Sequence, residues 1–200
     1  MQESRWLIIF VKAPRPGWVK TRLAESLGPD AACDAYKRMV KRLLREVEAL
    51  PNVQLRFSPD DAESELGRWL RPGWTILPQG GGDLGARLSR TFAESFAAGA
   101  ARVAIIGSDC PFISVDDIEQ AWSALNDHDV VLGPAHDGGY WLVALRAPAP
   151  VIFEDIPWST GRVLNVTLSR ARESGLRVHL LRELRDVDTV EDLRFFVERE

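Results

Sequence analysis

The amino-acid sequence predicts an α/β fold with a mainly parallel sheet and helices on both of its faces. Three observations indicate this fold. Short apolar runs of strand length alternate with longer segments whose apolar residues recur at three- and four-residue steps. The longer segments are long enough for the crossover helices that parallel strands require. No linker, repeat or low-complexity stretch divides the 200 residues, so we expect a single domain over residues 1–200.

The predicted strands are the short apolar runs. Residues 6–11 (WLIIFV) are continuously apolar, as expected for a strand that is buried on both faces, and residues 102–106 (RVAII) form the next clearest run. The other predicted strands cover residues 53–57, 74–77, 129–132, 140–145 and 176–181.

The predicted helices are the periodic segments between the strands. Residues 36–47 place apolar side chains on one face and lysines and arginines on the other. Ser114 can cap a helix over residues 116–125, and Ser159 or Thr160 can cap one over residues 162–174. The remaining predicted helices cover residues 60–70, 84–96 and 189–197.

The composition argues against several classes of protein. The net charge of −4, without a basic stripe, argues against nucleic acid as a partner. No apolar stretch approaches the roughly 18 residues of a membrane helix, and the first residues lack the features of a signal peptide. The two cysteines have no metal or redox spacing and the three histidines are scattered. We therefore expect a reduced, cytoplasmic protein without a membrane partner.

Polar residues gather where the predicted strands end. In open α/β sheets, ligands bind beyond the carboxyl ends of the strands, so polar residues at these ends are candidates for a site. If the sheet is parallel there, five clusters share one edge: KAPRPGWVKTRL (12–23), QGGGDLGAR (79–87), GSDCP (107–111), GPAHDGGY (133–140) and RDVDT (185–189). This coincidence favours a functional site at that edge.

The first cluster has the character of a phosphate-binding loop. Lys12, Lys20 and Arg22 bracket a loop that leads toward the start of a helix, where cations and backbone amides can share a phosphate. The spacing matches neither the Walker P-loop nor the Rossmann glycine fingerprint. The alternative is a rigid turn, made by the prolines and the glycine, with solvated cations around it.

The third and fifth clusters can hold a divalent metal. Asp109 ends a buried strand, and a carboxylate at a strand end is a natural ligand for Mg²⁺ (or Mn²⁺) that also contacts substrate phosphates. Asp186, Asp188 and Asp137 are the candidate partners, and we expect Asp109 and Asp137 to be the catalytic carboxylates. Two alternatives stay open, because Asp109 can cap a turn and Asp188 can cap the last helix.

The remaining clusters are rich in glycine, which permits a close backbone approach to a ligand. From the second cluster we expect Gly81, Gly82 and Arg87 at the nucleotide phosphates. The residues expected to bind the donor or the acceptor are Gly138, Gly139, Trp158, Ser159 and Thr160. Trp18 and Trp158 can stack on a base or a sugar, whereas Cys110 has no histidine placed to activate it and is expected to be buried.

Taken in order, these motifs resemble a known family. KAPRPGWVKTRL, QGGGDLGARL, GSDCP, GPAHDGGYWL, PWST and DVDTVEDL resemble the small bacterial radical-SAM/selenodomain-associated transferases, which are glycosyltransferase-A-like and include members associated with arsenosugar biosynthesis. The resemblance spans almost the whole chain. A more distant similarity extends to the phospholactate and molybdenum-cofactor guanylyltransferases.

The resemblance implies a glycosyltransferase-A-like fold of the nucleotide-diphospho-sugar transferase superfamily. It implies that the nucleotide phosphates are bound by Lys12, Lys20, Thr21 and Arg22. It also implies that Asp109 is the metal aspartate and that Asp186 or Asp188 is the second carboxylate. The chain departs from the guanylyltransferases at residues 13–19 (APRPGWV), and it has no Asp-x-Asp motif at residues 108–110.

Together these features predict a nucleotide-dependent transferase. With the resemblance they favour a glycosyltransferase that uses a nucleotide-diphospho-sugar donor, Mg²⁺ and a small-molecule acceptor. The first alternative is a nucleotidyltransferase, in which a phosphorylated acceptor attacks a nucleoside triphosphate and pyrophosphate is released. The second is a nucleotide-binding module without catalytic activity.

Overall fold

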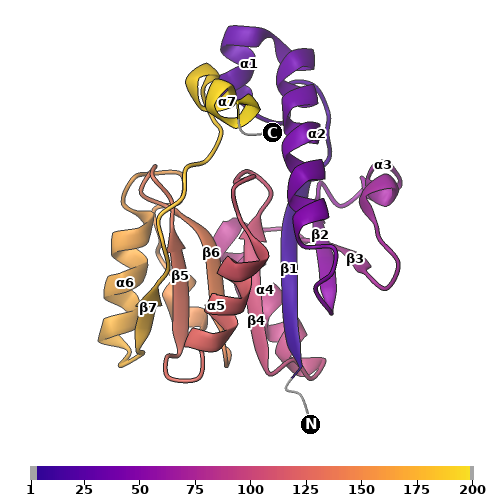
Figure 1. Cartoon of the computed structure of the whole chain (residues 1–200). Coiled ribbons are helices and arrows are strands. Elements are labelled where there is room, and N and C mark those ends of the chain that lie inside the picture. Colours follow the sequence, from indigo (N-terminus) through magenta and orange to yellow (C-terminus); the bar gives the residue numbers. More distant parts are fainter. Residues whose placement is uncertain (1–3, 199–200) are drawn as a thin grey trace.

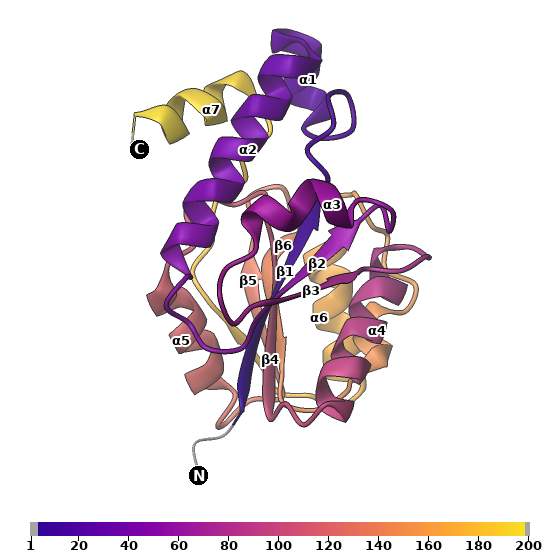
Figure 2. The same ribbon diagram turned by 90° about the vertical axis from the view of Figure 1, so that its right-hand side faces the viewer.

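The computed structural model describes residues 4–198, in which seven strands form one sheet between two layers of helices (Figures 1 and 2). The strand order is β3-β2-β1-β4-β6-β5-β7, and β6 alone runs antiparallel to its neighbours. The strands are β1 (Arg5–Lys12), β2 (Val53–Ser58), β3 (Thr75–Pro78), β4 (Arg102–Gly107), β5 (Val130–Pro134), β6 (Tyr140–Leu145) and β7 (Val178–Leu180). The prediction of a mainly parallel α/β sheet is confirmed.

Helices cover both faces of the sheet because the central strands are apolar on both faces. In β1, Leu7 and Ile9 pack under α2 and α5, whereas Ile8 packs under α4 and α6. Figure 2 shows these two helical layers on opposite sides of the strands. The helices are α1 (Thr21–Leu27), α2 (Pro29–Glu46), α3 (Glu63–Leu66), α4 (Leu84–Ala97), α5 (Val115–Ala124), α6 (Val163–Glu173) and α7 (Val190–Val197). Two short 3-10 helices cover Gly67–Trp69 and Pro150–Phe153.

A third cluster of apolar residues lies beyond the carboxyl end of the sheet. Leu23 of α1, Met39 of α2 and Phe196 of α7 are fully buried in it, together with Val187. Figure 1 shows α1, the first turns of α2 and α7 grouped above the strand ends. This cluster joins the segment after β1 to the segment after β7, which are the segments that carry the basic and acidic side chains described below.

The structure corrects several predicted boundaries. The helix predicted over residues 36–47 begins at Pro29, because Pro occupies its first turn directly after Gly28, whose φ is +83°. The helix predicted over residues 60–70 shrinks to α3 and a 3-10 turn. Ser114 caps α5 in a capping box with Asp117, as expected.

The cap predicted for α6 is wrong. Arg162, rather than Ser159 or Thr160, is the residue that precedes the helix, and its side chain makes no cap. The hydroxyl of Thr160 instead accepts from the amide of Arg162 and donates to the carbonyl of Pro157, so it closes the turn before the helix. Within residues 4–198, no helix combines the length and the apolar character needed to cross a membrane.

Candidate functional site

The carboxyl ends of the strands surround a cavity of about 450 Å³. The acidic residues that line it are Asp109, Asp137, Asp186 and Asp188. Its opposite wall is aromatic and hydroxylic, and consists mainly of Tyr140, Trp141, Trp158, Ser159 and Thr160. The clusters that follow β4, β5 and β7 therefore meet at one place, although they are far apart in the sequence.

The loop after β1 is held rigidly against its neighbours. The guanidinium of Arg15 donates to the carboxylate of Glu65 in α3, with Nη2 and Oε1 2.6 Å apart. The thiol of Cys33 in α2 donates to the carbonyl of Pro14. Trp18 lies at the tip of the loop with 63% of its surface exposed, and Arg15 lies over its ring. Arg15 is thus part of the framework of the loop.

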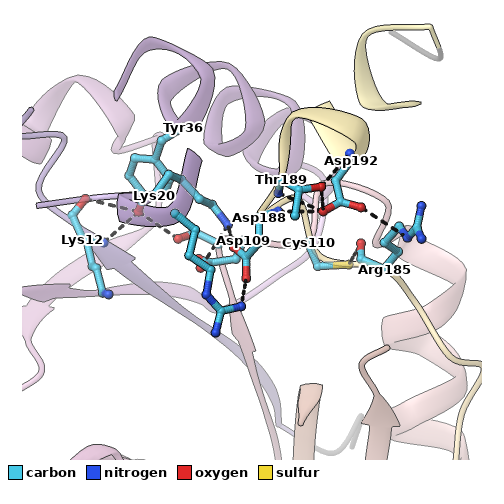
Figure 3. Close-up of polar contacts among 11 residues, drawn as sticks. Lys12, Lys20, Tyr36, Asp109, Cys110, Arg185, Asp188, Thr189 and Asp192 are labelled. Carbon is cyan, nitrogen blue, oxygen red and sulfur yellow. Dashed lines mark hydrogen bonds and ion pairs between the residues drawn. The ribbon is translucent and has the colours of Figure 1, made fainter. Parts of the chain in front are cut away.

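Lys20 is the centre of the polar network at this edge (Figure 3). It precedes α1 in the left-handed conformation, with φ 49° and ψ 50°, and this turns its side chain inward. Its Nζ lies 3.0 Å from Oδ1 of Asp188 and 3.3 Å from Oδ2 of Asp109, and only 2% of the side chain is exposed. Burial disfavours the charged form of Lys20, but the two carboxylates outweigh this effect and raise the pKa of its ammonium group. Lys20 is therefore a buried cation.

Tyr36 of α2 links the loop after β1 to the strand end that carries Asp109. Its hydroxyl accepts from the amide of Lys12 at 2.8 Å and lies 2.9 Å from the hydroxyl of Ser108 (Figure 3). Burial raises the pKa of this phenol. The side chain of Lys12 is exposed at the same edge, whereas Thr21 is the exposed first residue of α1. Neither Lys12, Lys20 nor Thr21 lines the cavity itself.

The four carboxylates differ in their partners. Although burial opposes it, the charges of Lys20 and Lys12 hold the pKa of Asp109 below its usual value. Burial and the charges of Asp109 and Asp137 raise the pKa of Asp186 to about 7. Among the residues described, Asp186 forms no hydrogen bond or ion pair. Asp188 instead pairs with Lys20 and lies 3.7 Å from Arg22, whose exposed side chain also lines the cavity.

The structure decides between the alternatives for the aspartates. Asp188 does not cap the last helix, because Thr189 caps α7 in a capping box with Asp192. Asp109 does not cap a turn through its side chain, which bonds Lys20. Cys110 is buried, and burial raises the pKa of its thiol, which donates to the carbonyl of Arg185.

The glycine-rich loop after β3 has its own internal framework. Gly80 and Gly82 have positive φ values of 76° and 99°. Arg87 donates from Nε to the carbonyl of Gly82 at 2.9 Å, so this side chain holds the loop. Gly81, Gly82 and Arg87 lie at the same sheet edge, but they do not line the cavity. Their expected contact with nucleotide phosphates therefore stays a prediction.

The residues expected to bind the donor or the acceptor come together through a glycine contact. Gly138 has φ +85°, and a β-carbon there would overlap with the backbone of Gly161. The amide of Leu164 donates to the carbonyl of Gly138 at 2.9 Å, which fastens the start of α6 to the loop after β5. This contact places Gly139 and Trp158 at one cavity.

Sequence reasoning missed several residues of the cavity. Tyr140, Trp141 and Leu84 lie within the quoted motifs but were given no role in binding, and Gly161 was not singled out. Tyr140 packs edge-on against Trp158, with ring centroids 6.3 Å apart. Aromatic residues directly after Gly138-Gly139 are a signal that could have pointed to them.

The residues present have the right chemistry for a divalent cation, but they do not enclose one. Carboxylate oxygens are the ligands that Mg²⁺ prefers, and burial together with the charges of Asp109 and Asp137 raises the pKa of Asp186. Within residues 4–198, no three acidic, histidine or cysteine side chains are grouped closely enough to hold an ion by themselves. A cation at Asp109 and Asp186 would need further oxygen ligands from phosphate or water.

The fold and the site define the chain as a protein with the nucleotide-diphospho-sugar transferase fold. The crystal structure of a Desulfovibrio desulfuricans G20 protein, provisionally named a nucleotide-diphospho-sugar transferase, superposes with a TM-score of 0.91 at 34% identity, over 98% of this chain and 87% of that one. The chain belongs to the family of proteins conserved in bacteria that is designated DUF2064 and described as uncharacterized, whose model matches residues 43–160.

Two relatives with assigned activities are similar over most of their length. The phosphoenolpyruvate guanylyltransferase of Sphaerobacter thermophilus is 32% identical over an alignment of 197 residues, and the match covers 93% of this chain and 90% of that protein. The 2-phospho-L-lactate guanylyltransferase of Methanopyrus kandleri is 37% identical over 180 residues, 87% of this chain and 82% of that protein. The expected transferase class and the expected similarity to guanylyltransferases are confirmed. These relatives agree with the nucleotidyltransferase alternative better than with glycosyl transfer, and the radical-SAM and arsenosugar association stays a prediction.

Proposed function

We propose that the protein is a nucleotidyltransferase, which transfers a nucleoside monophosphate from a nucleoside triphosphate to a phosphorylated acceptor and releases pyrophosphate. The observation that carries the proposal is the pairing of buried Lys20 with Asp109 and Asp188 beside the cavity. In this pairing a buried cation of the loop after β1 lies next to carboxylates of the type that hold a metal. The names of the two guanylyltransferase relatives support GTP as the donor.

In the proposed reaction, an oxygen of the acceptor phosphate attacks the α-phosphorus of the triphosphate. The bond from that phosphorus to the oxygen bridging toward the β-phosphorus breaks, and pyrophosphate leaves with the electron pair. A phosphate monoester is largely a dianion at pH 7, because its second pKa is about 6, so the nucleophile needs no general base. The protein therefore acts mainly by positioning the two substrates and by neutralising the charge of their phosphates.

The cations of the first cluster stabilise the negative charge that develops on the leaving pyrophosphate. Lys20 is buried and fixed, whereas Lys12 and Arg22 have exposed side chains that can reach phosphate oxygens. Asp109 and Asp186 would hold Mg²⁺ or Mn²⁺, which supplies neutralisation of charge on the phosphates. We assign Asp186 rather than Asp188 to this role, because Asp188 faces two cations, Lys20 and Arg22, whereas Asp186 has no partner among the described residues.

The experiment that tests this proposal is an assay of pyrophosphate release. GTP, ATP, CTP and UTP are each incubated with the protein, Mg²⁺ and a set of phosphorylated acceptors, and the nucleotidyl product is identified by its mass. We expect pyrophosphate with GTP, and none with a GTP analogue that has a methylene bridge between the α- and β-phosphorus atoms. Release of a nucleoside diphosphate from a nucleotide-sugar, without pyrophosphate from any triphosphate, would show glycosyl transfer instead.

A further inference from the structure

A second, apolar cavity of about 120 Å³ opens beside the carboxylate-lined one. Both cavities share Leu84, Gly107, Tyr140 and Trp141 in their walls, so they lie side by side. The rest of the second cavity consists of apolar side chains from β1, β4, β6 and α4: Phe10, Leu88, Ile105, Ile106, Leu142 and Val143. It has no charged lining residue.

The volume and the chemistry of this second cavity limit what can occupy it. An apolar cavity of about 150 Å³ is known to bind benzene, so this one suits a branched alkyl group or a small ring. A nucleotide base fits it poorly, because the cavity offers few partners for the hydrogen-bonding edge of a base. Leu84 and Tyr140 line both cavities, whereas Gly81 and Gly82 line neither. The organic part of the acceptor is therefore the better occupant.

The first cavity is unsuited to a second negative charge on the acceptor. Four carboxylates line it, and Arg22 is the one lysine or arginine among the described lining residues. Arg22 already faces Asp188. A metal and the cations of the loop can balance the reacting phosphates, but a carboxylate on the acceptor would add negative charge to a cavity lined by four carboxylates and would be repelled by them.

Backbone amides that could hold such a carboxylate are already used. The amide of Gly139 donates to Oδ1 of Asp137 at 2.8 Å, and the amide of Gly138 donates to the carbonyl of Ala135. The amides of residues 162–164 donate to Thr160 and Gly138. Around Asp137, these backbone amides are therefore not available to an anionic group.

We propose that the acceptor is a phosphate monoester whose organic part is uncharged and apolar, and that this part enters the cavity between Leu84, Tyr140 and Trp141. The proposal rests on the proposed nucleotidyl transfer. It separates this chain from its relatives by substrate, since phosphoenolpyruvate and 2-phospholactate each carry a carboxylate beside the phosphate.

A matched pair of acceptors tests the proposal. Isopropyl phosphate is 2-phospholactate with a methyl group in place of the carboxylate, and phenyl phosphate adds a ring of benzene size. Pyrophosphate release from GTP and Mg²⁺ gives kcat/KM for each. We expect isopropyl phosphate to exceed 2-phospholactate by about tenfold or more, and phenyl phosphate to exceed isopropyl phosphate, because each apolar carbon removed from water adds to binding. A preference for 2-phospholactate or phosphoenolpyruvate would overturn the proposal.

Binding is measured separately, so that this proposal and the proposed function can fail independently. Trp141 and Trp158 line the first cavity, and titration of acceptors with Mg²⁺ should change tryptophan fluorescence without any turnover. The fluorescence change is assigned to Trp158 if the Trp158→Phe variant no longer shows it. If no triphosphate yields pyrophosphate, nucleotidyl transfer is wrong, and the titration still decides the acceptor. Absence of binding by both apolar phosphates, or tighter binding of 2-phospholactate, contradicts the acceptor class.

A charge placed at the junction of the cavities should reverse the preference. Leu84 is 41% exposed, so Leu84→Lys can be accommodated without unfolding, and it adds a cation where the acceptor enters. We expect kcat/KM to rise several-fold for 2-phospholactate and to fall for phenyl phosphate. The control is Leu180→Lys, which changes a leucine of similar exposure, 46%, on β7 outside both cavities. Equal effects of the two substitutions would contradict the role of Leu84.

Discussion

The Nζ of Lys20 lies 3.0 Å from the carboxylate of Asp188, although 168 positions separate the two residues in the chain. Lys20 precedes α1 and Asp188 precedes the cap of α7, and the two helices pack together in the cluster above the sheet. The packing of buried Leu23 and Phe196 therefore holds together the two ends of the site. A substitution in this apolar cluster would change the distance between the charged groups of Lys20 and Asp188.

Removal of the buried cation should damage both stability and activity. Lys20→Met leaves Asp109 and Asp188 without their shared partner, and we expect a loss of about 1–3 kcal/mol in the free energy of unfolding. We also expect pyrophosphate release to fall by about 100-fold or more, as for other charge-stabilising groups. Denaturant unfolding and the pyrophosphate assay measure these effects.

Lys37→Met is the matched control for this substitution. Lys37 also pairs with an aspartate, Asp34, but the pair is exposed on α2 and neither residue lines the cavity. An exposed pair contributes little, so stability and activity should stay near those of the natural protein. Equal losses in the two variants would contradict the role given to Lys20.

Asp109→Asn should remove the dependence on the metal. We expect GTP with Mg²⁺ to raise the melting temperature of the natural protein more than GTP alone does, and this difference should vanish in the variant. Asp116→Asn, at an exposed position in the first turn of α5, should keep the difference. An undiminished effect of Mg²⁺ on Asp109→Asn would remove Asp109 from the proposed metal site.

The crowding of negative charge at Asp186 predicts a pH dependence of stability. Burial and the charges of Asp109 and Asp137 raise the pKa of Asp186 from 3.8 to about 7, so between these values the folded protein binds the proton that the unfolded chain releases. In EDTA, the contribution of Asp186 to stability should therefore fall as the pH rises from about 4 to 7 and stay low above that. The Asp186→Asn variant should not show this loss of stability when its melting temperature is measured over the same pH range. A parallel pH profile for both proteins would show that the pKa of Asp186 is not raised in the folded protein.

Gly138→Ala should separate the two loops that form the wall of the cavity. The added methyl group would overlap with the backbone of Gly161, and φ is +85° at this position. Strain of this kind costs about 1–3 kcal/mol, and displacement of Ser159 and Thr160 should lower kcat/KM as well. Gly175→Ala is a control with a similar positive φ of 70° and no atom within 4 Å of the added carbon. It should lose some stability but keep its activity.

Several parts of the site follow from the sequence because they depend on local patterns. Apolar runs and crossover lengths predict parallel strands, and parallel strands place the polar segments after residues 102–106 and 129–132 at the same edge of the sheet. By the same rule Asp109 and Asp137 were expected at one site, and they line one cavity. The boundaries of α3 and the cap of α6 were wrong, because they depend on turns whose hydrogen bonds are not visible in a periodic pattern.

By itself, the sequence determined the α/β class, the edge of the sheet at which the polar residues gather and the residue types available there. Only the tertiary structure decided which charges meet: Asp188 pairs with Lys20, Asp186 has no partner among the described residues, and Arg87 holds its own loop. The tertiary structure also revealed the apolar cavity at Leu84 and the contact between Gly138 and Gly161. The physical reason is that these contacts join segments distant in the chain, and their partners are set by packing in three dimensions rather than by the spacing of residues along it.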